Sequence, residues 1–156
     1  MPIREIAEIL TGQPVFAGFD AETMALLAGC ARNERFAPGS MIFREGDAAD
    51  KVFILRKGDV AEEIATPAHE PMIVETLHAG DILGWEWLVP PYRSLSDARA
   101  LTAVSAVSLD AACLRRKCDA NPVLGYRMFQ HWLPHLTRRV RAQRLQLLDL
   151  YGSRAE

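Results

Sequence analysis

The chain has 156 residues, of which 49% are hydrophobic and 24% are charged, values that are ordinary for a soluble globular protein. This length fits one domain and is enough to bury a core. No apolar run approaches the ~20 residues that a membrane-spanning helix needs, and the N-terminus lacks the pattern of a signal peptide. The three cysteines, Cys30, Cys113 and Cys118, are an odd number without disulfide-framework spacing, which favours a reducing cytoplasm.

The net charge of -2 is unevenly distributed. Residues 1–109 carry nine Lys and Arg against sixteen Asp and Glu, whereas residues 110–156 carry nine against four. A basic C-terminal part is compatible with binding to nucleic acid or to an acidic partner. A solvated helix face explains the same charges, and we favour that interpretation.

The first part of the chain, residues 1–35, is predicted to be a helical lead-in. Apolar residues recur at helical spacing over residues 3–10, and the Gly-Gln-Pro of residues 12–14 ends the pattern. Asp20 is a candidate N-cap of a second helix, because its carboxylate can accept from free backbone amides. We expect this second helix to end near Asn33.

The pattern changes at Phe36 to short apolar runs separated by turns. Pro-Gly or Gly-Asp pairs divide the runs at residues 38–39, 46–47, 58–59 and 80–81. Short strands with this spacing and turn chemistry are typical of an all-β sandwich, barrel or jelly roll. We therefore predict a mainly β fold with flanking helices, in which residues 36–109 form a jelly-roll β-roll that binds a ligand.

Two capping signals predict helices after the β-roll. Asp110 is expected to cap a short helix, and Asn121 followed by Pro122 begins the longest regular element of the chain, as far as about Tyr151. Pro134 lies inside this long helix and is expected to kink it or to leave a locally broken hydrogen bond. Residues 110–156 thus form the helical end of what we take to be one domain.

The long helix carries a heptad-like apolar seam, which beyond Leu136 favours self-association over packing on its own domain alone. Near the start of the helix, packing on the domain core still explains Tyr126 and Phe129. The spacings of the seam alternate between three and four, and one member is polar. Four arginines, at positions 138, 139, 141 and 144, are expected on the solvent faces beside it. The seam residues are Tyr126, Phe129, Leu133, Leu136, Val140, Gln143, Leu147 and Leu150.

Two segments resemble the cyclic nucleotide-binding domain: residues 36–47 (FAPGSMIFREGD) and residues 52–60 (VFILRKGDV). The similarity runs from about Pro14 to the end of the chain. It is closest to the sensor half of the catabolite-activator and fumarate-nitrate regulator family, including that family's dimerising helix. In that family the helix leads into a helix-turn-helix DNA reader. Because this sequence stops at Glu156, the resemblance implies a stand-alone sensor without that reader.

The resemblance also implies a phosphate-binding cassette within residues 80–100. In the family, a Gly-Glu pair opens a short helix and an Arg followed by a small residue binds the cyclic phosphate. Gly84 fits the glycine, but Trp85 follows it and the carboxylate comes one residue later, at Glu86. Counted from Arg99-Ala100, the phosphate arginine falls on Ser94, so a one-residue slip would be needed to use Arg93.

The candidate ligand-binding residues differ in the role expected of each. Two tryptophans beside the carboxylate either stack on a planar ligand or fill the pocket, and we favour filling. Arg99 matches a structural or relay arginine of the family, and pairing with a nearby acid is the alternative. The full candidate set is Gly84, Trp85, Glu86, Trp87, Arg93, Ser94 and Arg99.

No arrangement of a nucleophile and a base stands out, so we do not expect an enzyme. His131 and His135 stand four residues apart on the long helix, but no third ligand lies near them in sequence, so no metal site is predicted. His78 precedes the cassette and leaves a haem sensor of the same fold as a further alternative. An ordinary turn also explains its position.

The prediction that follows is a regulatory sensor that binds a small ligand and transmits its presence through a dimerising helix. The candidate ligands are the cyclic nucleotides cAMP and cGMP, and no other cofactor is expected. The expected partners are a second copy of the chain and an effector protein, without a membrane or nucleic acid. One alternative is a ligand-independent protein-interaction module whose pocket is filled by Trp85 and Trp87. A second is a nucleic-acid binder that uses the basic C-terminal helix.

Overall fold

Capping side chains and turn residues divide the chain into helices and strands, and residues 2–153 are described by the computed structural model. Four α-helices and two short 3-10 helices flank or join the strands: α1 (Ile3–Thr11), α2 (Ala21–Ala28), α3 (Ala111–Ala120), α4 (Pro122–Gly152), η1 (Pro14–Phe16) and η2 (Trp85–Leu88). The strands are β1 (Ala31–Phe36), β2 (Met41–Phe43), β3 (Lys51–Lys57), β4 (Val60–Thr66), β5 (His69–Leu77), β6 (Ile82–Leu83), β7 (Asp97–Ala100) and β8 (Val104–Asp110).

The predicted helix caps are confirmed. The Asp20 carboxylate accepts from the Thr23 amide at 2.7 Å, and the Asp110 carboxylate accepts from the Cys113 amide at the same distance. The Asn121 side chain caps α4, whose first residue is a proline. Each cap satisfies a backbone N–H that the helix itself leaves without a partner.

The second helix is shorter than predicted, because it ends at Ala28 and not near Asn33. Gly29 follows it, and β1 then pairs antiparallel with β8 in the register Ala31 to Leu109. The β-roll therefore begins five residues before Phe36. Strand β1 is rich in charged side chains, so only its pairing with β8 reveals it as a strand.

The eight strands form two four-stranded antiparallel sheets, with orders β1-β8-β3-β6 and β2-β7-β4-β5. One apolar cluster joins them, with Phe53 and Leu55 from the first sheet and Val60 and Ala98 from the second. This arrangement is the predicted jelly-roll β-roll. Burial of apolar side chains from both sheets is the main force that holds such a sandwich together.

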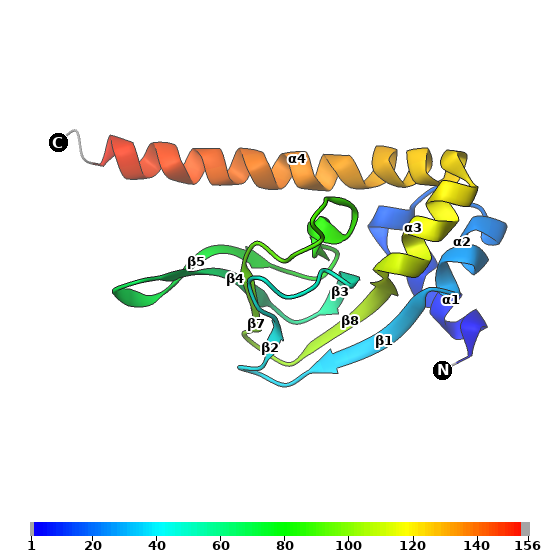
Figure 1. Cartoon of the computed structure of the whole chain (residues 1–156), viewed down its shortest axis with the longest axis horizontal. Helices are drawn as coiled ribbons and strands as arrows, with labels where there is room; N and C mark the ends of the chain where they lie inside the picture. The colour runs from blue at the N-terminus through cyan, green and yellow to red at the C-terminus, as the bar shows by residue number, and fades with distance from the viewer. Residues whose placement is uncertain (1, 154–156) are drawn as a thin grey trace.

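A second apolar cluster fastens the helices to the first sheet. It joins Leu10 of α1, Leu27 of α2, Val107 of β8, Leu114 of α3 and Trp132 of α4. Figure 1 shows α1, α2 and α3 gathered at one end of the roll, with α4 running from that end along the roll. The helical ends of the chain therefore share one core with the strands.

The turn at Gly58 is one place where the predicted glycine is indispensable. Its φ of 89° lies in the left-handed region that favours glycine. A Cβ at this position would lie 2.3 Å from the carbonyl oxygen of Ala103, a distance at which the backbone would have to move. The close approach of β3–β4 to the loop before β8 thus depends on the absence of a side chain.

The cysteine spacing did not predict a disulfide, but Cys30 and Cys113 form one. They are 83 residues apart in sequence, but Cys30 immediately precedes β1 and Cys113 lies in the first turn of α3, directly after β8. Antiparallel pairing of β1 with β8 brings these two ends together. Cys118 is the remaining free thiol.

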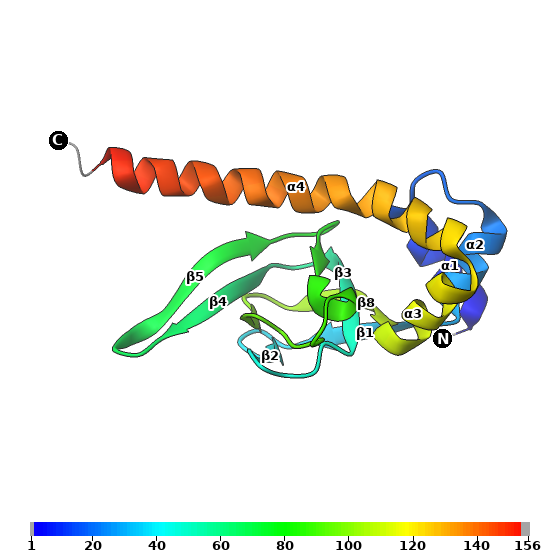
Figure 2. The same cartoon turned by 45° about the horizontal axis from the view of Figure 1, so that its top comes forward.

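Helix α4 continues through Pro134 as one element of 31 residues. Within residues 2–153, no helix is both long enough and apolar enough to cross a membrane. Figures 1 and 2 both show α4 alongside the β4–β5 hairpin, with its last turns at the far end of the molecule from α1 and α2.

Candidate functional site

The predicted cassette is built from β6, η2 and the loop that leads to β7. Gly84 begins η2 with a φ of 91°, and a Cβ there would lie 3.0 Å from the carbonyl oxygen of Lys51. Glycine at this position therefore allows the start of η2 to pack against β3. This close approach gives a structural reason for the glycine, independent of any ligand.

A cavity of about 150 Å³ opens into the β-roll beside Gly84. Ser94 lines it and is only 4% exposed, whereas Arg93 is exposed and donates to the carbonyl oxygen of Gly46 at 3.3 Å. The cation among the lining residues is Lys51, whose ammonium lies 2.6 Å from Glu34. The serine, and not the arginine, therefore lines this cavity.

Glu86 and Arg99 are both committed to contacts within the protein. The Glu86 carboxylate accepts from the backbone amide of Leu95 at 3.2 Å and so ties η2 to the loop before β7. The Arg99 guanidinium pairs with Glu63, a buried carboxylate on the neighbouring strand β4, at 3.1 Å. Arg99 thus has the acid partner that the sequence offered as an alternative.

Trp85 and Trp87 pack on α4. Both rings stand edge-on to Trp132, with centroid distances of 6.4 and 6.2 Å. Neither is among the residues that line the 150 Å³ cavity, so they neither fill it nor offer it a stacking surface. The indole N–H groups of Trp85 and Trp132 are buried without a hydrogen-bond partner among the described residues.

An arginine of α3 also contacts the predicted cassette. The Arg115 guanidinium donates to the carbonyl oxygen of Trp87 and lies 4.3 Å from the centroid of the Tyr92 ring. Such a cation–π contact is worth about 0.5–1 kcal/mol at a partly exposed site. The cassette is therefore held by both helices that follow the β-roll.

The prediction that Arg139 lies on a solvent face is wrong. Its side chain is 13% exposed, and its guanidinium donates to Glu62 at 2.9 Å, to Glu75 at 2.8 Å and to the carbonyl oxygen of Ile82 at 2.8 Å. Burial raises the pKa of Glu62, and the Arg139 cation opposes that rise. We call Arg139, Glu62 and Glu75 the α4–hairpin ion cluster.

Sequence reasoning missed this cluster, although the chain contained a signal for it. Glu62 and Glu75 each interrupt an apolar strand, and a buried carboxylate requires a cation or several donors. Because Arg139 turns inward, the arginines of α4 do not form one face. The nucleic-acid alternative thereby loses one of the four arginines that the sequence placed on the solvent faces of the helix.

The apolar seam of α4 is largely exposed. Side chains at both ends of the seam and at its centre are exposed to solvent. Gln143 instead faces the β4–β5 hairpin, where its side chain donates to Glu75 at 3.2 Å. The exposed members are Tyr126, Phe129, Leu133, Val140, Leu147 and Leu150. An unpartnered apolar stripe of this length is typical of an interaction surface.

The histidines that sequence singled out are engaged locally. The His131 Nδ1 atom lies 2.8 Å from the carbonyl oxygen of Arg127, the His135 ring contacts Arg138, and His78 lies 2.7 Å from Asp59. Within residues 2–153, no group of three or more His, Cys, Asp or Glu side chains could hold a metal ion.

A two-sheet β-roll with helices at one end and a long helix along its side is the architecture of a class of ligand-sensing regulatory domains. The model of the cyclic nucleotide-binding domain matches residues 33–121. The chain therefore belongs to the cyclic nucleotide-binding domain family, as its two glycine-rich segments predicted.

Curated relatives and solved structures agree with this membership. The chain is 27% identical over 143 residues to the CRP-like cAMP-activated global transcriptional regulator of Mycobacterium tuberculosis, covering 92% of this chain and 62% of that protein. It is also 27% identical to the HTH-type transcriptional regulator Cmr of the same species, with 84% and 52% covered. The chain thus spans between half and two thirds of these relatives. A cyclic nucleotide-binding domain from Methylobacillus flagellatus KT shares the fold, with a TM-score of 0.77, 21% identity, and 94% and 83% covered.

Proposed function

We propose that this chain is a dimeric cytoplasmic sensor that transmits the state of its β-roll through α4 to an effector protein. The observation that carries the proposal is the placement of α4. The helix is tied to the β4–β5 hairpin by the α4–hairpin ion cluster and to the cassette by Trp132, and it leaves its apolar seam exposed. A change at the cassette would therefore reach a surface that is suited to a second copy of the chain.

The Trp contacts offer a physical means of transmission. Each buried indole N–H without a partner costs about 1–3 kcal/mol. A rearrangement of η2 against α4 that gave these groups partners would be favoured by a comparable amount. A ligand can shift the equilibrium between two arrangements of η2 and α4 only by the difference between its affinities for them. Because the unsatisfied indole donors destabilise the present arrangement, a smaller difference in ligand affinity is enough to shift the equilibrium to the other one.

The proposed ligand is a cyclic nucleotide, cAMP or cGMP, bound at the cassette. Family membership and the curated cAMP-activated relative support this choice. Drug-sized ligands occupy pockets of about 300–1,000 Å³, and the cavity at Gly84 is about 150 Å³. Binding would thus require the loop at Arg93 to move, which would exchange the contact with Gly46 for one with the phosphate.

Calorimetric titration with cAMP and with cGMP tests the ligand. We expect saturable heat with one of the two nucleotides. Arg93→Ala should bind that nucleotide at least tenfold more weakly than the wild type does. Arg35→Ala, which removes an exposed arginine of β1, is the matched control and should bind as the wild type does. Absence of heat with both nucleotides would remove cyclic nucleotides as ligands.

Sedimentation tests the dimer. Leu147 and Leu145 are both 53% exposed on the same helix, but only Leu147 lies on the seam. A charge buried in an apolar interface is costly, so Leu147→Asp should shift the protein to monomer while Leu145→Asp leaves the dimer intact. A wild-type monomer at micromolar concentration would contradict the proposal.

A second candidate is a ligand-independent interaction module, and one observation favours it. Ser94, which the sequence count aligns with the family's phosphate arginine, is buried, and no arginine is among the residues that line the small cavity. In that case the same exposed seam would bind a partner constitutively. A stable dimer together with silent calorimetry would identify this function.

A further inference from the structure

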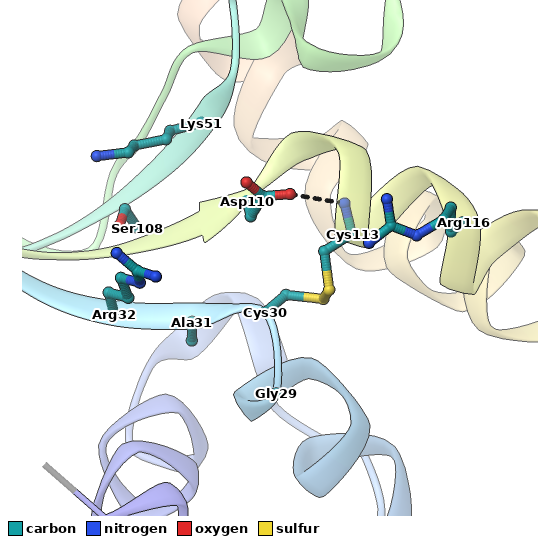
Figure 3. Close-up of a pocket in the computed structure, with 9 residues that line it drawn as sticks. All are labelled: Gly29, Cys30, Ala31, Arg32, Lys51, Ser108, Asp110, Cys113 and Arg116. Carbon is teal, nitrogen blue, oxygen red and sulfur yellow. Dashed lines mark hydrogen bonds between the residues drawn. A yellow bond between two sulfur atoms is a disulfide. The ribbon is translucent and has the colours of Figure 1, made fainter.

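A second, larger cavity lies at the junction between the β-roll and the helices, and Lys51 lines both this cavity and the one beside Gly84. Its volume is about 380 Å³, within the range of about 300–1,000 Å³ that small-molecule sites occupy. It is lined by Gly29, Cys30, Ala31, Arg32, Lys51, Ser108, Asp110, Cys113 and Arg116. Figure 3 shows that the Cys30–Cys113 disulfide lies at this site, with Arg32 and Lys51 on the strands and Arg116 on the helix side.

The charge around the disulfide is positive. Three cations line the cavity against one acid, Asp110, which already accepts from the amide of Cys113. Lys51 is paired with Glu34, whereas Arg32 and Arg116 have no carboxylate partner within residues 2–153. Two unpaired guanidinium groups beside a cavity favour a ligand that carries carboxylates or other anionic groups.

From this juxtaposition we infer that the cavity is a modification site, at which an anionic low-molecular-weight thiol exchanges with the Cys30–Cys113 disulfide. The inference rests on the proposed cytoplasmic location, where disulfides are usually catalytic or redox-sensing and not structural. This inference is independent of any ligand in the β-roll. It adds a second input to the proposed sensor, at the point where β8 passes into α3.

The two cysteines differ in exposure, and we take this difference to select the one that is attacked. Cys30 is 5% exposed, whereas Cys113 is half-buried. The incoming thiolate attacks Sγ of Cys113, a new S–S bond forms to Cys113, and the bond between Cys113 and Cys30 breaks. The electron pair of the broken bond leaves on Sγ of Cys30, which takes a proton. The small thiol is thereby oxidised, Cys30 is reduced, and the adduct remains on Cys113 beside Arg116.

Kinetics of disulfide opening test the inference, with Cys118→Ser as background so that only the paired cysteines react. Glutathione, which is anionic at neutral pH, and cysteamine, which is cationic, are the two probes. At low ionic strength, Arg32→Gln/Arg116→Gln should slow opening by glutathione about tenfold, as expected for lost electrostatic attraction, and should not slow opening by cysteamine. Arg35→Gln, on the same strand but outside the cavity, should change neither rate.

Mass spectrometry of the products completes the test. The inference expects one glutathione per chain, located on the peptide that contains Cys113. It would be overturned by an adduct on Cys30, by equal slowing of both thiols in the double variant, or by a glutathione rate that falls less than twofold. Aerobically purified protein in which Cys30 and Cys113 are both free thiols would also overturn it.

Discussion

Removal of the Arg139 guanidinium is the sharpest test of how α4 is held. In Arg139→Gln, the carboxylates of Glu62 and Glu75, whose side chains are each 14% exposed, lose their common cation and repel each other. Breaking a buried ion pair by removing one partner costs about 3–5 kcal/mol. Because the cluster retains some exposure, we expect a loss near the lower end, about 3 kcal/mol. For a domain of this size, that loss corresponds to a fall in Tm of about 6–12 °C.

The pH dependence of this loss has a definite sign. Burial raises the pKa of Glu62, and Arg139 opposes the rise. The folded state of the variant therefore holds the Glu62 proton more tightly than the wild type does. Stability that depends on this proton is present at low pH and is lost as pH rises through the folded pKa. The deficit of Arg139→Gln should thus be smaller at about pH 5 than at about pH 8.

Urea unfolding followed by circular dichroism, at fixed protein concentration, measures the deficit. Arg141→Gln, an exposed arginine two residues further along α4, is the matched control and should change the free energy of unfolding by less than about 0.5 kcal/mol. Arg139→Gln/Glu75→Gln should recover part of the loss, since it removes one of the two unpaired charges. A deficit below about 1 kcal/mol, or one that grows towards acid pH, would refute the reasoning.

Three further outcomes are expected. Gly58→Ala should lower the free energy of unfolding by more than about 2 kcal/mol because its Cβ would strike backbone, whereas Gly39→Ala, with a φ of 81° and open space around it, should cost only about 1 kcal/mol in a denaturation series. The hydrogen bond with Asp59 raises the pKa of His78. Asp59→Asn should therefore lower that pKa in an NMR titration. In the wild type, the small stabilisation by protonated His78 should be lost as pH rises through the folded-state pKa. Trp132→Ala should cost about 3–5 kcal/mol in the same denaturation assay because the ring is 2% exposed. Equal losses at the two glycines, an unmoved His78 titration, or a Trp132 loss below about 1 kcal/mol would contradict these expectations.

Local rules that act within a few residues explain what was predicted correctly. Turns at Gly58 and Gly80, and helix caps at Asp20 and Asp110, need only neighbouring backbone to operate, so the sequence is sufficient to locate them. The same glycine-rich segments indicated the cyclic nucleotide-binding fold. Strand β1 was missed because its residues become a strand only by pairing with β8, which lies more than sixty residues later in the chain.

The candidate site was predicted less completely, because its residues face partners that periodicity does not reveal. The sequence placed Ser94 and Arg93 together at the cassette, but only the folded loop turns Ser94 into the cavity and Arg93 outward. Likewise, Trp85 and Trp87 were assigned to the pocket, whereas α4 supplies Trp132 as their neighbour.

By itself, the sequence determined the β-roll, its turns, the capped helices and the apolar seam of α4. Tertiary structure alone decided three features: the inward turn of Arg139, the position of the tryptophans, and the meeting of Cys30 with Cys113. The physical reason is the sequence separation over which each interaction acts. Turn and cap preferences are settled by adjacent backbone, whereas a buried charge or a thiol acquires its role from residues tens of positions away, which only the packed sheets and helices bring into contact.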